Sequence, residues 1–247
     1  MEMHIEKAGK TRATKLIALA VLATCGLNSA GVFAAPAKGS REHIAAVTGQ
    51  VDEKSVRANT ARTDDWPSYG LDYAETRHSK LTEINTGTVK KLGLVWSYNL
   101  ESTRGVEATP LVVDGIMYVS AAWSVVHAVD VRSGKKIWTY DPKVPREMGF
   151  KGCCDVVNRG VALYKGKVFV GTFDGRLVAL DAATGKTVWT KDTVEDHSHS
   201  YTVTGAPRVI KGKVIIGNGG AEYGVRGYIT AYDADSGEQK WRWYTVP

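Results

Sequence analysis

The sequence is poor in cysteine and proline and has no run of charges of one sign. Only three cysteines and seven prolines occur among 247 residues. Basic side chains outnumber acidic ones by six, but they are scattered, whereas a nucleic-acid-binding surface needs clustered basic residues. The 43% of hydrophobic residues exclude a wholly disordered chain, and 26 glycines fall far short of a collagen repeat. The composition therefore indicates a globular protein that does not bind nucleic acid.

Two cofactor signatures are also missing. The sequence contains no C-x-x-C-H run, to which haem c attaches, and no G-x-G-x-x-G run of the kind that binds nicotinamide dinucleotides. The histidines add little. His197 and His199 stand one residue apart, but two histidines alone do not complete a metal site, so we expect a surface loop there. His127 lies in an apolar strand and is predicted to be a core or interblade residue.

One long apolar run is present, and it lies near the N-terminus. Basic residues at 7, 10, 12 and 15 precede an apolar stretch from Leu16 to Leu27, and small residues follow at 34–37. This order is typical of a cleaved secretory signal, which we assign to residues 1–37. A membrane anchor from Leu16 to Ala37 is the alternative, which several polar and glycine residues within it weaken. Cys25 follows Thr24 in a poor match to a lipoprotein cleavage box.

Export predicts a periplasmic protein, in a compartment where disulfides form. Cleavage would remove Cys25 and leave the adjacent pair Cys153 and Cys154. No other apolar run approaches the ~18 residues of a membrane span, so we expect none in the mature chain. Residues 38–62 are polar without a clear hydrophobic period, and we predict a flexible leader there, ahead of a folded region over residues 63–247.

The folded region contains a threefold internal repeat. Each repeat ends in an Asp, a Gly four residues later and a Trp four residues after that. The tryptophans are Trp138, Trp189 and Trp241, at spacings of 51 and 52 residues. The repeats also begin alike, at residues 109–115, 160–166 and 206–212. A constant period of this length predicts tandem structural units.

Within one repeat the pattern predicts short β-strands. Residues 168–172 and 177–181 are β-branched and apolar, and Asp174-Gly175 between them is a hairpin signal. A further strand begins at residue 187, and helical spacing is absent. About 50 residues holding four short strands form one blade of a β-propeller. We therefore predict an all-β fold in which each terminal Trp packs between neighbouring blades, because plain core aromatics would not recur in one frame.

This frame resembles the tryptophan-docking repeat of the quinoprotein alcohol dehydrogenases, which carry pyrroloquinoline quinone (PQQ) in an eight-bladed propeller. Residues 65–70, residues 75–77 and Trp96 look like the N-terminal signature of that family. The resemblance runs from about residue 64 to the last residue. It implies about three blades of a probable eight. The family's catalytic base, further metal ligands and the Trp that underlies the cofactor are therefore expected beyond Pro247.

The adjacent pair Cys153 and Cys154 is the most informative motif. Neighbouring Cα atoms stand ~3.8 Å apart, whereas ordinary disulfides span ~4.4–6.8 Å, so a bridge between them would be strained. Such strain tends to persist at functional sites. In the family this ring lies over one face of PQQ, and the residues that follow it here, 155–160, match the family pattern. Two buried thiols without a function are the alternative.

Three polar residues complete the expected contacts with the cofactor. Arg159 can meet a PQQ carboxylate with two parallel N–H bonds, and the family places an Arg at this position; a surface Arg is the alternative. Glu107 is an acid in an otherwise apolar strand entry, where a buried carboxylate must be bonded, and the family directs it to a cofactor oxygen or a nearby cofactor group. Thr204 matches the family's hydroxyl donor.

The glycine-rich stretch 217–227 is the second strong motif. Its glycines permit close approach of the backbone to a ligand, although a hairpin or bulge also accounts for them. The resemblance implies that Gly220 and Ala221 contact PQQ and that Glu222 ligates Ca²⁺, a hard cation that prefers carboxylate oxygens. Some relatives carry Ser where this chain has Gly219, so one side-chain bond to PQQ is missing or replaced by backbone.

The resemblance implies an enzyme that oxidises alcohols to aldehydes with PQQ and Ca²⁺ and passes electrons to a cytochrome c or a membrane quinone. The sequence does not separate Ca²⁺ from a lanthanide, and haem c would require a further C-terminal region. We expect this chain alone to be inactive. A non-catalytic propeller scaffold of the outer-membrane assembly lipoprotein type is the alternative, which the Cys pair and residues 219–222 disfavour. An aldose or membrane-type quinoprotein dehydrogenase is the third possibility.

Overall fold

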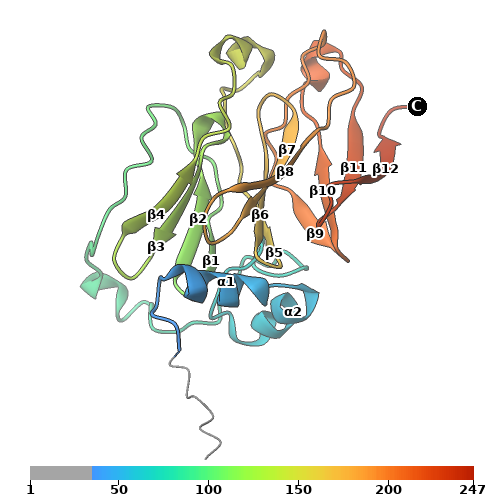
Figure 1. Ribbon diagram of the computed structural model, residues 1–247. Helices are drawn as coiled ribbons and strands as arrows, with labels where there is room; N and C mark the ends of the chain where they lie inside the picture. Colours follow the sequence, from blue (N-terminus) through green and yellow to red (C-terminus); the bar gives the residue numbers. More distant parts are fainter. Residues whose placement is uncertain (1–34) are drawn as a thin grey trace, which may run out of the picture. The chain divides into compact units, whose positions relative to one another are not determined.

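Twelve short strands form three four-stranded antiparallel sheets in the computed structural model, which describes residues 35–247 (Figure 1). The predicted signal, residues 1–37, lies almost wholly outside the described residues. In each sheet the strands follow one another in sequence order. The first sheet contains β1 (Leu111–Val113), β2 (Ile116–Ser120), β3 (Val126–Asp130) and β4 (Lys135–Tyr140). The second contains β5 (Ala162–Tyr164), β6 (Lys167–Gly171), β7 (Arg176–Asp181) and β8 (Thr187–Asp192). The third contains β9 (Arg208–Ile210), β10 (Lys213–Gly217), β11 (Tyr228–Asp233) and β12 (Gln239–Tyr244).

The three sheets confirm the predicted blades, with one repeat to each sheet. The repeated frame sets the turn between the last two strands. In the second sheet the Asp181 carboxylate accepts hydrogen bonds from the backbone N–H groups of Ala183 and Thr184. The Gly185 N–H donates to the Asp181 carbonyl at 2.8 Å with φ at +69°, a conformation that favours glycine. Each repeat also has a bulge at the same place in its third strand, as between Ala179 and Leu180.

Trp138 and Trp189 dock on the following sheet, as predicted, whereas Trp241 is exposed. The Trp138 indole N–H donates to the carbonyl of Ala182 at 3.0 Å, and its ring lies against Gly185. Trp189 contacts the third sheet in the same frame, with its indole N–H bonded to the Ala234 carbonyl at 3.3 Å. These contacts lie in two apolar cores, one between the first and second sheets and one between the second and third.

Trp96 docks in the same way, which the spacing of the repeats does not predict. Its indole N–H donates to the Val131 carbonyl at 2.7 Å, and its ring lies against Gly134. It stands 42 residues before Trp138, outside the regular period, and no strand is assigned around it among the described residues. Residues 94–96 therefore occupy the place that the last strand of a preceding blade would take. Leu94 and Val95 beside it are exposed.

Residues 38–62 differ from the flexible leader that we predicted. They form two helices, α1 (Arg41–Gly49) and α2 (Glu53–Arg62), at one end of the sheets in Figure 1. Asp52 caps α2 in a reciprocal bond with Ser55, and buried Ile44 and Val56 join the core of the first two sheets. The helices are short and largely polar, so the apolar residues that anchor them are too few to give a visible period.

Four short 3₁₀ helices complete the described chain: Val89–Lys91, Ala122–Ser124, Arg146–Lys151 and Ala221–Tyr223. The third of these helices precedes the Cys153–Cys154 pair, and the fourth lies within the glycine-rich stretch 217–227. Within the described residues, no helix combines the length and the apolar character that crossing a membrane requires.

Candidate functional site

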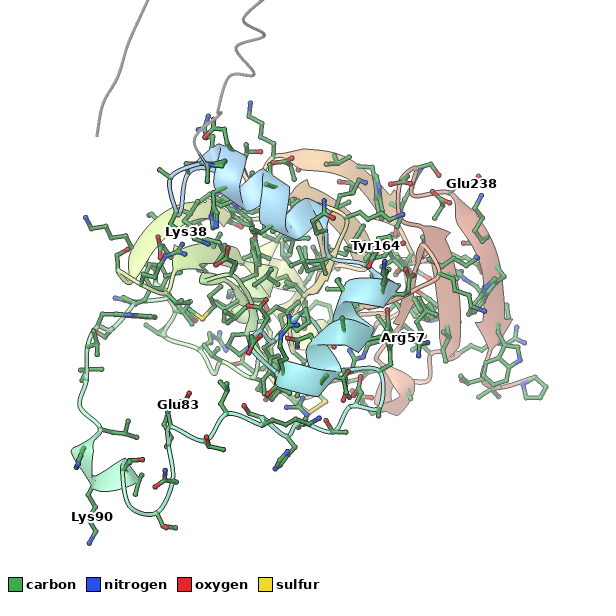
Figure 2. The ribbon with its side chains drawn as sticks, turned by 90° about the horizontal axis from the view of Figure 1, so that it is seen from below. Lys38, Arg57, Glu83, Lys90, Tyr164 and Glu238 are labelled. Atoms are coloured by element: carbon green, nitrogen blue, oxygen red, sulfur yellow. A yellow bond between two sulfur atoms is a disulfide. The ribbon has the colours of Figure 1, made fainter. Side chains whose placement is uncertain are left out.

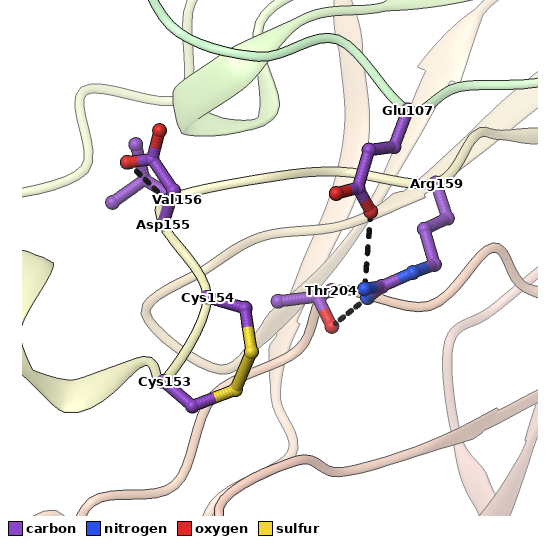
Figure 3. The surroundings of a disulfide bond; sticks show 7 residues. All are labelled: Glu107, Cys153, Cys154, Asp155, Val156, Arg159 and Thr204. Atoms are coloured by element: carbon purple, nitrogen blue, oxygen red, sulfur yellow. Dashed lines mark hydrogen bonds and ion pairs between the residues drawn. A yellow bond between two sulfur atoms is a disulfide. The ribbon is translucent and has the colours of Figure 1, made fainter.

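Cys153 and Cys154 form a disulfide in a loop between the first and second sheets (Figure 3). Their Cα atoms are 3.8 Å apart, and both residues are exposed to solvent. The disulfide thus presents its surface to a pocket instead of filling a core, which disagrees with the alternative of two buried thiols. A small planar molecule could lie against it.

The residues that flank the disulfide hold its loop from both sides. A Cβ atom on Gly152 would lie 2.7 Å from the Phe173 ring, so the chain passes too close there for any larger residue. After the pair, Asp155 has φ of +72° and accepts a bond from the Arg104 guanidinium at 2.7 Å. The buried Asn158 side chain donates to the Gly171 carbonyl at 2.8 Å. The same Asn158 side chain accepts from the Ser120 hydroxyl at the end of β2, so the loop is anchored to both neighbouring sheets.

Arg159 joins two other predicted residues in one polar chain (Figure 3). Its Nη1 donates to the Thr204 hydroxyl at 2.7 Å, and its Nη2 lies 3.1 Å from the Glu107 carboxylate. The side chains of Arg159 and Glu107 are 41% and 45% exposed. Glu107 precedes β1 and is not the buried carboxylate in a strand entry that the sequence suggested. Its bond to Arg159 meets the expectation that this acid is partnered.

Backbone hydrogen bonds also connect Thr109, Arg159 and Thr204, which precede the first strands of the three sheets. The Arg159 N–H donates to the Thr204 carbonyl at 2.9 Å, and the Thr109 N–H donates to the Arg159 carbonyl at 3.2 Å. Each of these residues stands just before the first strand of its own sheet. The end of the blades that carries the disulfide is therefore built from three successive repeats.

The glycine-rich stretch follows β10 and turns back towards the same pocket. Gly219 pairs with Thr202 in an antiparallel bridge. Gly220 has φ of +109°, and a Cβ atom there would lie 2.3 Å from the Ser200 carbonyl oxygen. The close approach of the Ser200 backbone therefore requires a glycine at position 220, whether or not a ligand binds nearby. The next residues, Ala221–Tyr223, form an exposed 3₁₀ turn that carries Glu222.

These elements enclose one small pocket of about 80 Å³. Six predicted residues line it: Cys153, Cys154, Arg159, Thr204, Gly220 and Glu222. Glu107 reaches the group through its ion pair with Arg159. Ala221 is exposed next to the pocket and does not line it. Asp155 and Thr202 also line the pocket; neither had a predicted role. Asp155 directly follows the Cys pair, which is a usable signal, whereas its partner Arg104 is 51 residues away in the chain.

The chemistry of the lining suits a flat polyanion. A guanidinium and a hydroxyl are the donors, glycine backbone leaves room, and the exposed disulfide offers a polarisable face. PQQ carries three carboxylates on a planar ring system, so these residues fit one side of it. Glu222 supplies a single carboxylate for a cation. Among residues 35–247, no three His, Cys, Asp or Glu side chains are grouped to hold a metal ion.

The other titratable candidates lie outside this pocket, as the sequence indicated. His127 is 1% exposed, and burial lowers its pKa below the ordinary value. Its Nδ1 contacts the Tyr98 hydroxyl at 3.1 Å. His197 and His199 lie in an exposed loop, where each pairs with a separate aspartate and shares no ligand with the other.

A family model and two curated proteins resemble this chain over most of its length or over about two thirds of it. Residues 66–247 match the family model for the PQQ glucose/ethanol/alcohol dehydrogenase β-propeller domain. The chain is 68% identical over 227 residues to the quinohemoprotein alcohol dehydrogenase of Comamonas testosteroni, covering 92% of this chain and 32% of that protein. It is 70% identical over 169 residues to the 1-butanol dehydrogenase (cytochrome c) of Thauera butanivorans, covering 68% of this chain and 24% of that protein.

Solved structures agree with the fold. The crystal structure of the Comamonas testosteroni enzyme superposes with a TM-score of 0.82 at 71% identity, covering 84% of this chain and 31% of that one. A europium-containing methanol dehydrogenase superposes with a TM-score of 0.74 at 40% identity, covering 77% of this chain and 34% of that one. The chain thus spans about a third or less of the length of these relatives.

Proposed function

The chain belongs to the PQQ-dependent alcohol dehydrogenase family, and from that premise we propose that its disulfide pocket forms one wall of a PQQ site. One observation carries the proposal. Residues from the two loops that join the three repeats and from the third repeat itself, which are far apart in the sequence, converge on a single pocket with a guanidinium, a hydroxyl and a disulfide. The scaffold alternative offers no reason for that convergence, and the family match disfavours it.

Each pocket residue takes a definite role in this proposal. Arg159, oriented by Glu107 and Thr204, would bind a carboxylate of PQQ through its remaining N–H groups. The Cys153–Cys154 disulfide would cover one ring face and exclude water from it. The backbone at Gly220 and Ala221 would border the ring, and Glu222 would contribute one carboxylate to a Ca²⁺ ion. PQQ, when bound, supplies the redox group for alcohol oxidation.

We assign turnover to the full-length protein, because this chain spans about a third or less of its relatives. The proposed reaction is the oxidation of alcohols to aldehydes. Relatives named as quinohemoprotein, cytochrome c-linked and quinone-linked dehydrogenases support a cytochrome c or a quinone as the electron acceptor. A lanthanide in place of Ca²⁺ is the second candidate, since one relative is a europium-containing enzyme. The basic, apolar and small-residue order of residues 1–37 supports export to the periplasm.

Two measurements on the purified protein test the pocket. Mass spectrometry without reduction should give a peptide with the Cys153–Cys154 pair two hydrogens lighter than its reduced form. Titration with PQQ, followed by quenching of tryptophan fluorescence, should saturate. Free thiols that alkylate readily, together with no saturable binding by the full-length protein, would overturn the proposal.

A further inference from the structure

An ion pair between Arg104 and Asp155 lies beside the disulfide, and the contacts proposed for PQQ give it no role. The Arg104 Nη1 donates to the Asp155 Oδ1 at 2.7 Å, and Asp155 directly follows Cys154. The two side chains are 54% and 30% exposed. Because an isolated pair with this exposure contributes little to folding stability, a larger effect can come only from what the pair holds in place.

The pair joins two segments of the chain, residues 104–109 and residues 155–160. Three residues after Arg104, the Glu107 carboxylate pairs with Arg159 at 3.1 Å. Each segment thus contributes one acid and one base to these pairs, in opposite order, and the two pairs follow in the same direction along both segments. If one segment were reversed, like charges would meet at both positions. The charges therefore favour a single alignment of the two segments.

The first segment lies outside the sheets. Residues 101–107 belong to no strand, and all but one of them are exposed. Upstream of them, the stretch in which Figure 2 labels Glu83 and Lys90 lies apart from the sheets. Downstream, Thr109 forms a parallel bridge with Gly160. The two ion pairs and this bridge therefore hold an otherwise exposed stretch against the loop that carries the disulfide.

The backbone at Asp155 has a conformation that residues other than glycine rarely adopt. Its φ is +72°, and its Oδ1 accepts the N–H of Val156 at 2.8 Å as well as the bond from Arg104. Asp and Asn tolerate this left-handed region because their short side chains bond locally. Residues held there cluster at ligand sites, where the surrounding structure fixes them. One carboxylate oxygen thus ties the turn after the disulfide to the Arg104 guanidinium.

We propose that the Arg104–Asp155 ion pair positions the Cys153–Cys154 disulfide in the PQQ pocket. Asp155 lines that pocket together with both cysteines and Arg159. Without the pair, the turn after the disulfide is free to move relative to Arg159, and the disulfide and the guanidinium no longer face one ligand together. Arg104 and Asp155 are positioning residues in this account. The inference rests on the proposed PQQ site.

The first measurement needs no cofactor. Hydrogen exchange of the purified full-length protein without PQQ, followed by mass spectrometry, should be about three- to tenfold faster in Arg104→Gln for the peptide that contains Val156. Arg104→Lys retains the charge and a donor for the carboxylate, so it should restore slow exchange. Arg62→Gln is the matched control, because it breaks another exposed ion pair, with Asp64 at 2.6 Å, and should leave this peptide unchanged.

The second measurement connects the pair to the cofactor. Arg104→Gln should raise the Kd for PQQ by about three- to tenfold in the fluorescence titration, whereas Arg62→Gln should leave it unchanged. Asp155→Asn keeps the left-handed backbone and the acceptor for Val156 but loses the ion pair, so it should raise the Kd equally. The double variant should show no further loss, because both changes remove one contact.

Urea unfolding of the same variants guards against a folding defect, since an exposed pair should change the free energy of unfolding little. With PQQ binding intact in the unmodified protein, an unchanged exchange rate or an unchanged Kd in Arg104→Gln would overturn the positioning role alone. A lower Kd in Asp155→Asn would overturn it as well, because the carboxylate would then only repel the carboxylates of PQQ. Absence of saturable PQQ binding by the unmodified protein would overturn the proposed function and this inference with it.

Discussion

The glycines in the tryptophan-docking turns allow a sharp test of how the blades hold together. Gly185 has φ of +69°, and a Cβ atom there would lie 2.7 Å from the Trp138 ring. Gly212 has nearly the same φ, +68°, but within the described residues its Cβ atom would meet nothing closer than 4 Å. Gly185→Ala and Gly212→Ala therefore share the same backbone strain and differ in the contact with the indole.

The expected loss of folding free energy in each variant follows from the backbone strain and from the contact with the Trp138 ring. An alanine in the left-handed region costs about 1 kcal/mol of folding free energy, and both variants carry that cost. Overpacking a core adds about 1–3 kcal/mol, which only Gly185→Ala incurs. The ring cannot move aside freely, because its N–H is bonded to the Ala182 carbonyl at 3.0 Å. We expect Gly185→Ala to lower the free energy of unfolding by about 2–4 kcal/mol and Gly212→Ala by about 1 kcal/mol.

Urea unfolding, followed by circular dichroism, measures both values. A double-mutant cycle then isolates the contact. In the Trp138→Leu background the smaller side chain leaves room, so the added cost of Gly185→Ala should fall to that of Gly212→Ala. If the two glycine variants lose the same stability, or if the excess survives in the Trp138→Leu background, the docking argument is wrong.

Three further predictions concern the pocket, a buried histidine and the helices. Arg159→Lys should raise the Kd for PQQ at least tenfold, measured by fluorescence titration of the full-length protein, because Lys cannot make two parallel bonds; an unchanged Kd would remove Arg159 from the site. Burial lowers the pKa of His127, so the folded state binds fewer protons than the unfolded state, and the free energy of unfolding should fall as pH drops below about 6.5. His127→Asn should make that fall smaller in urea titrations at pH 7 and pH 5, and identical slopes would contradict the assignment. Ile44→Ala, at a fully buried position in α1, should cost about 2–4 kcal/mol in urea unfolding, whereas a loss below about 0.5 kcal/mol would mean that the helix is not part of the core.

The repeats made the blades predictable, because their turns depend on local chemistry. Asp181 accepts bonds from residues two and three positions later, and Gly185 needs a left-handed conformation. Both requirements are met by residues within one short stretch of the repeat, from Asp181 to Gly185. The tryptophan eight residues after each Asp then packs against the next copy of the same frame. A repeated sequence thus specifies both a turn and the surface that receives its neighbour.

Features that depend on distant partners were not predictable in this way. The helices α1 and α2 are stabilised by packing of Ile44 and Val56 on the sheets, and two apolar contacts do not make a period. Arg104 reaches Asp155 across 51 residues, and no local pattern marks it. Trp96 docks in the repeated frame but stands 42 residues before Trp138, so a search at the regular period passes over it.

The candidate site is a consequence of how the blades are placed against one another. Arg159 meets Thr204 twice, through its guanidinium and through its backbone N–H, although the two residues belong to different sheets. The docking of Trp138 and Trp189 on successive sheets sets the spacing between those sheets. A sliding of one sheet by a single residue, about 3.3 Å, would break both contacts. The polar end of the pocket therefore requires the second and third sheets in register, and no single repeat could form it.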